Sequence, residues 1–247
     1  MTTKSVSPPP DELNFVGKNG FTEIGQEFHR YFQRLCQLKP HEKVLDVGCG
    51  IGRMAIPLTG YLNEHAVYEG FDVVKKGIDW CQQNITPHYP NFHFRHADII
   101  NKNYNPYGKV PARQYRFPYP GAFFDFVFLT SVFTHMLPAD QGRYAAEISR
   151  VLKPGGRCLI TFFLLNGTQQ ELEAQGKNRM TFPFDHGICK THRRGAPEAA
   201  VAYREDYIRK LYRQNGLVIA EPIHYGSWSG RDDFLSYQDI VVAVKGR

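Results

Sequence analysis

The stretch VLDVGCGIGR, residues 44–53, is the strongest indication of the fold in this sequence. It begins with the apolar pattern of a buried strand and then carries a glycine at every second position, Gly48, Gly50 and Gly52. Glycine adopts backbone dihedrals closed to other residues and lets a ligand approach the main chain closely. The acid before the turn, Asp46, would repel a pyrophosphate but can accept a hydrogen bond from an ammonium group. The stretch therefore predicts a binding turn for a polar ligand with an amino-acid end.

Strands and helices alternate on both sides of this turn. The expected strands are residues 43–47, 66–71, 92–96, 124–129, 157–163, 217–224 and 237–244. The expected helices are residues 21–38, 54–62, 76–84, 141–152 and 205–214. Such alternation predicts right-handed βαβ units with helices on both faces of a parallel sheet. We therefore expect an α/β fold, a three-layer sandwich with a seven-stranded, mostly parallel sheet and an antiparallel C-terminal edge strand.

The organisation of the chain is expected to be simple. Residues 1–20 are predicted to form a flexible N-terminal tail, and residues 21–247 a single domain. Two polar, irregular stretches, residues 100–121 and 166–202, are longer than ordinary connections. Both leave the carboxyl ends of expected strands, where ligands of open α/β sheets bind. We expect both to cover the substrate.

Composition narrows the class of protein. The chain has 247 residues, a formal charge of +6 and five scattered cysteines without a CxxC pair. Scattered cysteines in odd number fit reduced, cytoplasmic thiols better than a disulfide framework or a zinc site. No apolar run approaches the roughly 20 residues that cross a bilayer, and the mild charge does not indicate nucleic acid. We expect a cytoplasmic protein with no metal, membrane or nucleic-acid partner.

The glycine spacing bears on which ligand binds. The dinucleotide fingerprint is GxGxxG, and its third glycine position falls on Arg53 here. No GK[ST] follows, so the turn is not a phosphate-binding P-loop. A nicotinamide-dependent oxidoreductase stays open as an alternative, although this sequence lacks the third glycine of the fingerprint.

Five segments together resemble a known family. Residues 44–53 look like the first motif of class I, Rossmann-like S-adenosylmethionine-dependent methyltransferases. Later landmarks follow in the family's order: Asp72 after the second strand, residues 97–99 after the third, residues 124–127 on the fourth, and the turn at residues 150–156 before the fifth. The resemblance covers roughly residues 40–165 and is closest to enzymes of the small-molecule or sugar type.

The resemblance implies S-adenosylmethionine as cofactor and a set of residues that bind it: Gly25, Asp46, Gly48, Cys49, Gly50, Arg53, Asp72, Val73, Asp98, Ile99 and Thr130. In this scheme Asp72 accepts from both ribose hydroxyls and Asp98 accepts from the adenine amino group. Other roles stay open, because Asp72 also suits a helix N-cap and Arg53 also suits a surface ion pair. Cys49 is interpreted as a small turn residue, since nothing in the sequence beside it lowers its pKa.

The segment after the fourth strand, residues 130–136, contains the candidate base His135. Its ordinary pKa suits proton transfer near neutrality, although a structural role under the loop is the stronger alternative. The predicted reaction is methyl transfer to an oxygen, less so a nitrogen, of a small molecule or sugar; the sugar follows from the resemblance alone. The alternatives are a methyltransferase acting on protein or RNA, the nicotinamide-dependent oxidoreductase, and a binding module without catalysis.

Overall fold

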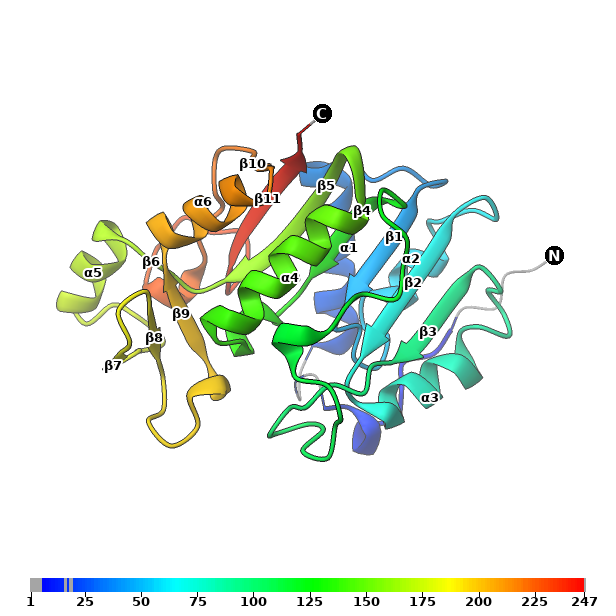
Figure 1. Cartoon of the computed structure of the whole chain (residues 1–247), viewed down its shortest axis with the longest axis horizontal. Helices are drawn as coiled ribbons and strands as arrows, with labels where there is room; N and C mark the ends of the chain where they lie inside the picture. The colour runs from blue at the N-terminus through cyan, green and yellow to red at the C-terminus, as the bar shows by residue number, and fades with distance from the viewer. Residues whose placement is uncertain (1–5, 16, 18–19, 247) are drawn as a thin grey trace. The chain divides into compact units, whose positions relative to one another are not determined.

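The main sheet of the computed structural model has seven strands (Figure 1), and the structure describes residues 6–15, 17 and 20–246. The strand order is β10-β11-β5-β4-β1-β2-β3. The strands are β1 (Lys43–Val47), β2 (Val67–Asp72), β3 (Phe92–His96), β4 (Phe124–Leu129), β5 (Leu152–Phe162), β10 (Leu217–Ile219) and β11 (Asp239–Lys245). β1 pairs in parallel with β2 and β4, and β2 with β3, whereas β11 is antiparallel to β5 and β10. The predicted α/β fold with its mostly parallel sheet is confirmed, and the antiparallel C-terminal strand lies between β5 and the edge strand β10.

Internal contacts divide the chain into two compact units, and each is described by itself. The first comprises Met1–Tyr115 and Phe123–Phe128, and the second Arg116–Ala122 and Leu129–Arg247. The helices of the first unit are η1 (Asp11–Leu13), α1 (Phe21–Cys36), α2 (Ala55–Thr59), α3 (Lys75–Asn84) and η2 (Ala112–Gln114). Those of the second are η3 (Phe133–His135), α4 (Pro138–Val151), α5 (Gly167–Ala174), η4 (Pro197–Ala199), α6 (Glu205–Gln214) and η5 (Ser227–Ser229). A single domain over residues 21–247 stays a prediction.

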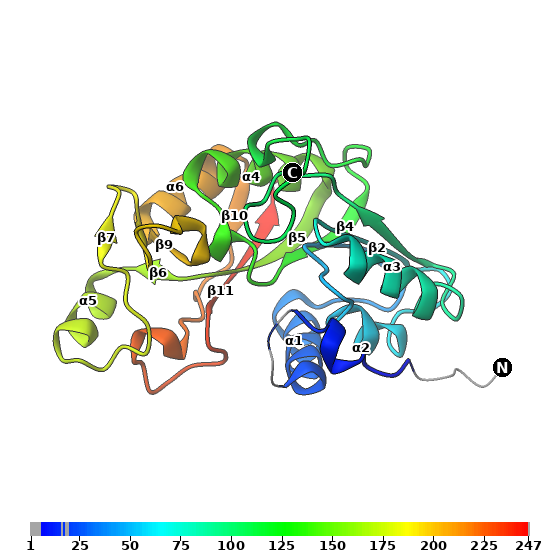
Figure 2. The ribbon, with the colours of Figure 1, turned by 90° about the horizontal axis from the view of Figure 1, so that it is seen from below.

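In the first unit, α1 packs its apolar face onto the sheet. The ring centroid of Phe32 lies 5.2 Å from that of Phe126 and 4.4 Å from that of Phe128, both on β4. α1 and α2 run side by side (Figure 2). A Cβ atom at Gly25 would lie 2.5 Å from the main-chain oxygen of Arg53, so only glycine lets α1 approach the residues after the glycine turn this closely.

In the second unit, α4 contacts β5 and α6 (Figure 1), and a buried ion pair fixes the segment before β4. Glu147, 3% exposed, accepts from Nη2 of Arg150 at 2.6 Å and from the amide of Phe117 at 2.9 Å. The Arg150 guanidinium also donates to the carbonyls of Phe117 and Tyr119. Phe117 and Tyr119 therefore anchor their loop to the body of the unit.

The stretch 166–202, predicted to be irregular, contains helices and most of a second sheet. Its strands and the short strand before it, in the order β6-β9-β8-β7, are β6 (Leu164–Leu165), β9 (Val201–Arg204), β8 (Cys189–Thr191) and β7 (Phe184–Asp185). Strands of two to four residues are too short for an apolar alternation to be recognised in sequence. The prediction that residues 166–202 are irregular was therefore wrong.

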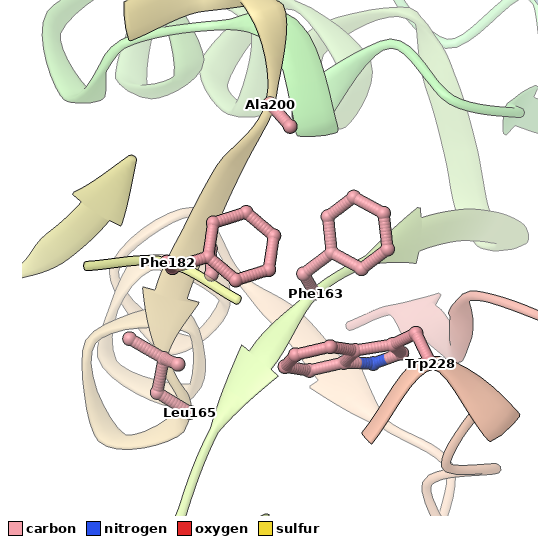
Figure 3. Close-up of a cluster of buried hydrophobic side chains, with 6 residues drawn as sticks. Phe163, Leu165, Phe182, Ala200 and Trp228 are labelled. Atoms are coloured by element: carbon pink, nitrogen blue, oxygen red, sulfur yellow. The ribbon is translucent and has the colours of Figure 1, made fainter. Parts of the chain in front are cut away.

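An aromatic cluster gives the second sheet its own core (Figure 3). The ring of Phe163, just beyond β5, lies 5.2 Å from Phe182 of the inserted stretch and 5.2 Å from Trp228 of η5. Leu165 and Ala200 complete the buried group that Figure 3 labels. Trp228 is 0% exposed. Full burial of a large apolar side chain stabilises the folded state by about 1.5–3 kcal/mol.

Several predicted boundaries differ from the structure. α2 is shorter than residues 54–62, because Pro57 removes a helical donor and Gly60 ends the last turn. β5 begins at Leu152 and includes the predicted turn 153–156, in which Gly155 has φ +77°. β10 ends at Ile219, while His224 forms a single antiparallel bridge with Ile240 instead of continuing the strand.

Candidate functional site

The glycine turn after β1 is tied to the end of β2 by main-chain bonds. Gly48, Gly50 and Gly52 have φ values of 82°, 58° and 81°, in the left-handed region that favours glycine. The amides of Gly48 and Cys49 donate to the carbonyl of Phe71 at 2.8 and 3.1 Å. The shape of the turn itself therefore requires the three glycines. Because glycine has no side chain, a ligand can approach the backbone of this turn closely.

Asp72, at the end of β2, holds the turn and the start of α3 together. Its Oδ2 accepts from the amide of Gly50 at 2.8 Å, and its Oδ1 accepts from the amide of Val74 at 2.8 Å. Burial raises the pKa of Asp72 although these amide donors lower it. Each carboxylate oxygen has a second lone pair, so the predicted bonds to two ribose hydroxyls remain possible beside the N-cap-like bonds that the structure contains.

Asp46 is fully buried beneath the turn. Its Oδ2 accepts from the hydroxyl of Tyr68 at 2.6 Å, whereas its Oδ1 meets no hydrogen-bond donor in the described part of the chain. Burial raises the pKa of Asp46 to about 8, and the nearby guanidinium of Arg53 acts in the opposite direction. A buried oxygen with an unfilled bond costs free energy. An amino or amide donor brought by a ligand would relieve that cost.

The ionisation of Asp46 predicts a pH dependence. The unfolded carboxyl has its ordinary pKa near 4 and the folded one about 8, so between these values the folded protein holds the proton more tightly. Stability from this group is full below about pH 4 and is lost as the pH rises through 8, by at most about 1.4 kcal/mol per pH unit. Urea unfolding from pH 5 to 8 should show wild type losing stability relative to Asp46→Asn. Parallel curves for the two proteins would refute the raised pKa.

The segment expected beside the adenine folds back on itself. Ile99 is 2% exposed and forms a bridge with Val110, while the Asp98 carbonyl accepts from the amide of Val110 at 3.0 Å. The Asp98 carboxylate lies 3.8 Å from Nζ of Lys109 and 3.5 Å from Nδ2 of Asn105, and is 41% exposed. It is therefore open to a further donor, as its predicted role requires.

The remaining predicted cofactor residues of the first unit surround the turn. Burial raises the pKa of Cys49 well above its ordinary value, which disfavours a thiolate and supports its interpretation as a small turn residue. Burial lowers the pKa of Arg53, while Asp46 acts to raise it. Val73 is half-buried, and its carbonyl lies 3.2 Å from Nε2 of His96. Contact of Gly25 and these residues with a donor stays a prediction.

Phe15, which is not among the predicted cofactor-binding residues, lies against Gly77 of α3, beside the glycine turn. A Cβ atom at Gly77 of α3 would lie 3.0 Å from Phe15 Cε1 and 2.6 Å from the carbonyl oxygen of Gly50. Nζ of Lys76 is 5.3 Å from the Phe15 ring centroid, and the ring of Tyr104 is 6.3 Å away. No sequence pattern identifies Phe15, because a lone phenylalanine in a polar segment has no periodicity.

In the second unit, the residues after β4 adopt a strained turn. Ser131 has φ +60°, which a residue with a Cβ rarely adopts. Its amide donates to Oγ1 of Thr161 on β5 at 2.7 Å, and its hydroxyl accepts from Nε2 of Gln238 at 3.0 Å. Thr130, predicted to contact the cofactor, is half-buried beside it. Strain of this kind is concentrated at functional sites, so the turn is a candidate for one.

His135 follows in η3. Its Nδ1 lies 3.0 Å from the carbonyl oxygen of Glu198 in η4. A carbonyl only accepts, so Nδ1 carries the proton and the lone pair is on Nε2. Burial lowers the pKa of His135, and the ring is therefore neutral at pH 7. The arrangement both fixes η3 against η4, as the structural alternative predicts, and leaves the tautomer that a general base needs.

A parallel α/β sheet, a GxGxG turn after its first strand and an acid at the end of the second define the class I, Rossmann-like S-adenosylmethionine-dependent methyltransferases. The chain belongs to the methyltransferase domain family, whose model matches residues 38–216. This membership decides against the nicotinamide-dependent oxidoreductase. The cofactor of this family is S-adenosylmethionine, and the fit of the turn to it rests on the unfilled oxygen of Asp46 and the exposed carboxylate of Asp98.

Curated relatives differ in the atom that they methylate. The chain is 29% identical over 140 residues to 27-O-demethylrifamycin SV methyltransferase of Amycolatopsis mediterranei (strain S699), covering 57% of this chain and 45% of that protein. It is 32% identical over 143 residues to phosphoethanolamine N-methyltransferase 3 of Arabidopsis thaliana, covering 58% and 25%. The chain therefore spans about a quarter to a half of the length of these relatives.

A solved structure shares the fold. Magnesium protoporphyrin IX methyltransferase from Synechocystis PCC 6803, with bound SAM, aligns with a TM-score of 0.55 at 18% identity, covering 92% of this chain and 80% of that one.

Among the described residues, no helix is long and apolar enough to cross a membrane.

Proposed function

We propose that the protein transfers a methyl group from S-adenosylmethionine to a hydroxyl oxygen of a small molecule or sugar. The observation that carries the oxygen assignment is the state of His135. Its Nδ1 lies 3.0 Å from the Glu198 carbonyl and carries the proton, so the ring's basic lone pair for proton transfer is on Nε2. A hydroxyl acceptor is a weak nucleophile until its proton is removed, whereas a neutral amine attacks through its lone pair and releases its proton afterwards.

The residues divide the work of this reaction. Asp46 and the glycine turn would hold the methionine end of the cofactor, Asp72 the ribose and Asp98 the adenine. The bound cofactor supplies an electrophilic methyl group on a positively charged sulfur. His135 takes the hydroxyl proton at Nε2, and the half-buried position of its ring limits competing protonation by water. Most of the remaining rate enhancement comes from holding the two reactants in line.

The catalytic role of His135 has a direct test. His135→Ala should lower kcat by about 10²- to 10⁴-fold, the usual contribution of a positioned base, while S-adenosylhomocysteine affinity stays within twofold. Activity is followed by transfer of a tritiated methyl group. His192→Ala is the matched control, since its Nδ1 also lies near a carbonyl, that of Thr181, at 2.8 Å. Equal activity of both variants would leave His135 as a structural residue.

The atom that receives the methyl group is tested separately. Incubation with S-adenosylmethionine carrying a ¹³C methyl group, followed by carbon NMR of the product, distinguishes an O-methyl from an N-methyl or C-methyl resonance by chemical shift. The proposal predicts an O-methyl signal. A signal on nitrogen or carbon would overturn the oxygen assignment without affecting the family.

We further propose that the acceptor is not a nucleic acid and that the reaction is cytoplasmic. The basic run at residues 190–194 is engaged locally, since Nζ of Lys190 lies 3.9 Å from Asp185 and the Arg194 guanidinium lies 6.0 Å from the Phe184 ring centroid. All five cysteines are buried free thiols, which supports a reducing compartment.

A further inference from the structure

A cavity of about 560 Å³ lies in the second unit, in the connection between β10 and β11. Leu172 of α5 forms one part of its wall, and the connection forms the rest. The first residue of β11, Asp239, pairs with Phe162, the last residue of β5. The connection therefore enters the sheet at the carboxyl end of β5, the edge at which open α/β sheets bind ligands. The volume is within the range of small-molecule sites, about 300–1,000 Å³.

Arg231 in the wall of this cavity is held from several sides. Its guanidinium carbon lies 4.4 Å from the ring centroid of Tyr225, which also lines the cavity. Nη1 donates to Oγ of Ser229 at 3.2 Å, and Nη2 donates to Oδ1 of Asn166 at 3.3 Å. Ser229 is 1% exposed, so one support of the guanidinium belongs to the buried body of the unit. A guanidinium has five N–H donors, and fixing it in advance lowers the entropy cost of binding.

Carboxylates and a ring complete the lining. Asp232 and Asp233 are exposed and follow Arg231 directly along the wall. Phe234 is 42% exposed, with the guanidinium carbon of Arg179 5.6 Å from its ring centroid. The cavity therefore offers fixed N–H donors, carboxylate acceptors and the face of an aromatic ring.

The mixture of charges selects the chemistry of the ligand. A phosphorylated ligand would meet two carboxylates beside one guanidinium, and a cationic ligand would meet the guanidinium of Arg231. A neutral polyol satisfies both kinds of group, because each hydroxyl donates to a carboxylate and accepts from an N–H. The carbon–hydrogen face of a sugar ring packs against an aromatic side chain such as Phe234 or Tyr225.

We propose that this cavity binds the neutral sugar ring of the methyl acceptor, with Arg231 and the Asp232–Asp233 pair as its hydroxyl-recognising groups. The proposal rests on the proposed function and assigns its acceptor class to named residues. Gln238, in the same connection, donates to the hydroxyl of Ser131 at 3.0 Å. Within the second unit, the connection that forms most of the cavity wall is thus also linked, through Gln238 beyond the wall itself, to the strained turn that precedes His135.

Saturation-transfer NMR on the full chain with S-adenosylhomocysteine present tests the assignment. The probes are methyl α-D-glucopyranoside, methyl β-D-galactopyranoside, methyl α-D-mannopyranoside and methyl α-L-rhamnopyranoside, with glycerol 3-phosphate as the anionic comparison. At least one glycoside should show saturation transfer. Its dissociation constant should rise at least tenfold in the double variant Asp232→Asn/Asp233→Asn and in Phe234→Ala. The matched control Asp206→Asn, an exposed acid of the same unit, should leave it unchanged.

Three results would overturn the assignment: no transfer to any glycoside, transfer that both cavity variants retain, or tighter binding of glycerol 3-phosphate than of every glycoside. Phe234→Ala removes no charge, so it tests the cavity even if the double aspartate variant loses stability. Calorimetry with S-adenosylhomocysteine alone distinguishes a failure of the sugar site from a failure of the proposed function. Cofactor binding without glycoside binding refutes only the sugar site, whereas absence of cofactor binding refutes the proposed function.

Discussion

Replacing Asp72 by alanine should weaken binding of S-adenosylhomocysteine by on the order of 10²- to 10⁴-fold, measured by calorimetry. Two hydroxyl bonds to a charged acceptor contribute about 1.5–3 kcal/mol each, and each 1.4 kcal/mol is a factor of about ten in affinity. The structure adds a second reason, because the Asp72 carboxylate also holds the amides of Gly50 and Val74. Its removal therefore loosens the turn that receives the methionine end.

Two further variants separate these effects. Asp72→Asn keeps one acceptor oxygen, so its affinity should fall between those of wild type and Asp72→Ala. Asp79→Ala removes an acid of α3 that pairs with Lys75 at the surface, at 2.6 Å, and should leave affinity unchanged. Wild-type affinity in Asp72→Ala would contradict the assignment of the ribose site.

Replacing Asp239 by alanine should cost about 3 kcal/mol of unfolding free energy, the largest stability effect that we expect. The carboxylate is 1% exposed and accepts from the amides of Leu164 and Gly226, both at 2.6 Å, and from Nε1 of Trp228 at 2.9 Å. A buried donor left without a partner costs about 1–3 kcal/mol. Part of that loss is offset, because burial of the carboxylate is itself costly and raises its pKa to about 7. Urea unfolding measures the difference.

The pH dependence of this loss distinguishes a buried acid from a surface one. The folded pKa of Asp239 is raised, so its contribution to stability is greatest below about pH 4 and declines as the pH rises through 7. The penalty of Asp239→Ala should therefore be larger at pH 5 than at pH 8. Asp206→Ala, at an exposed acid of α6, should cost less than about 1 kcal/mol at either pH. A pH-independent penalty below that value would contradict the role of Asp239.

The parallel strands β1 to β4 were predictable from sequence because each has several buried apolar residues, continuous in β4 apart from Asp125 and alternating in β3, close to a turn signal. Residues 43–47 and 92–96 match β1 and β3, and residues 205–214 match α6. The second sheet was not predictable. Its strands have two to four residues, and its core forms only when Phe182 meets Phe163 and Trp228, contacts that join distant parts of the sequence.

The candidate site likewise has one part that the sequence predicts and another part that it does not. The glycine turn and Asp72 are consecutive features of one βαβ unit, and the bond between Gly50 and Asp72 joins them as predicted neighbours. The groups assigned to the acceptor are different in kind. Arg231 acquires its position from Tyr225, Ser229 and Asn166, and the last of these is 65 residues away in sequence. No local pattern encodes such an arrangement.

A crystal structure of the protein with S-adenosylhomocysteine is the direct test that the turn after β1, the acid that ends β2 and the acid that follows β3 bind S-adenosylmethionine. We predict that the methionine end lies against Gly48–Gly50, that both ribose hydroxyls are within hydrogen-bond distance of the Asp72 carboxylate, and that the adenine amino group faces Asp98. A product molecule bound elsewhere, or none bound at saturating concentration, would contradict the account.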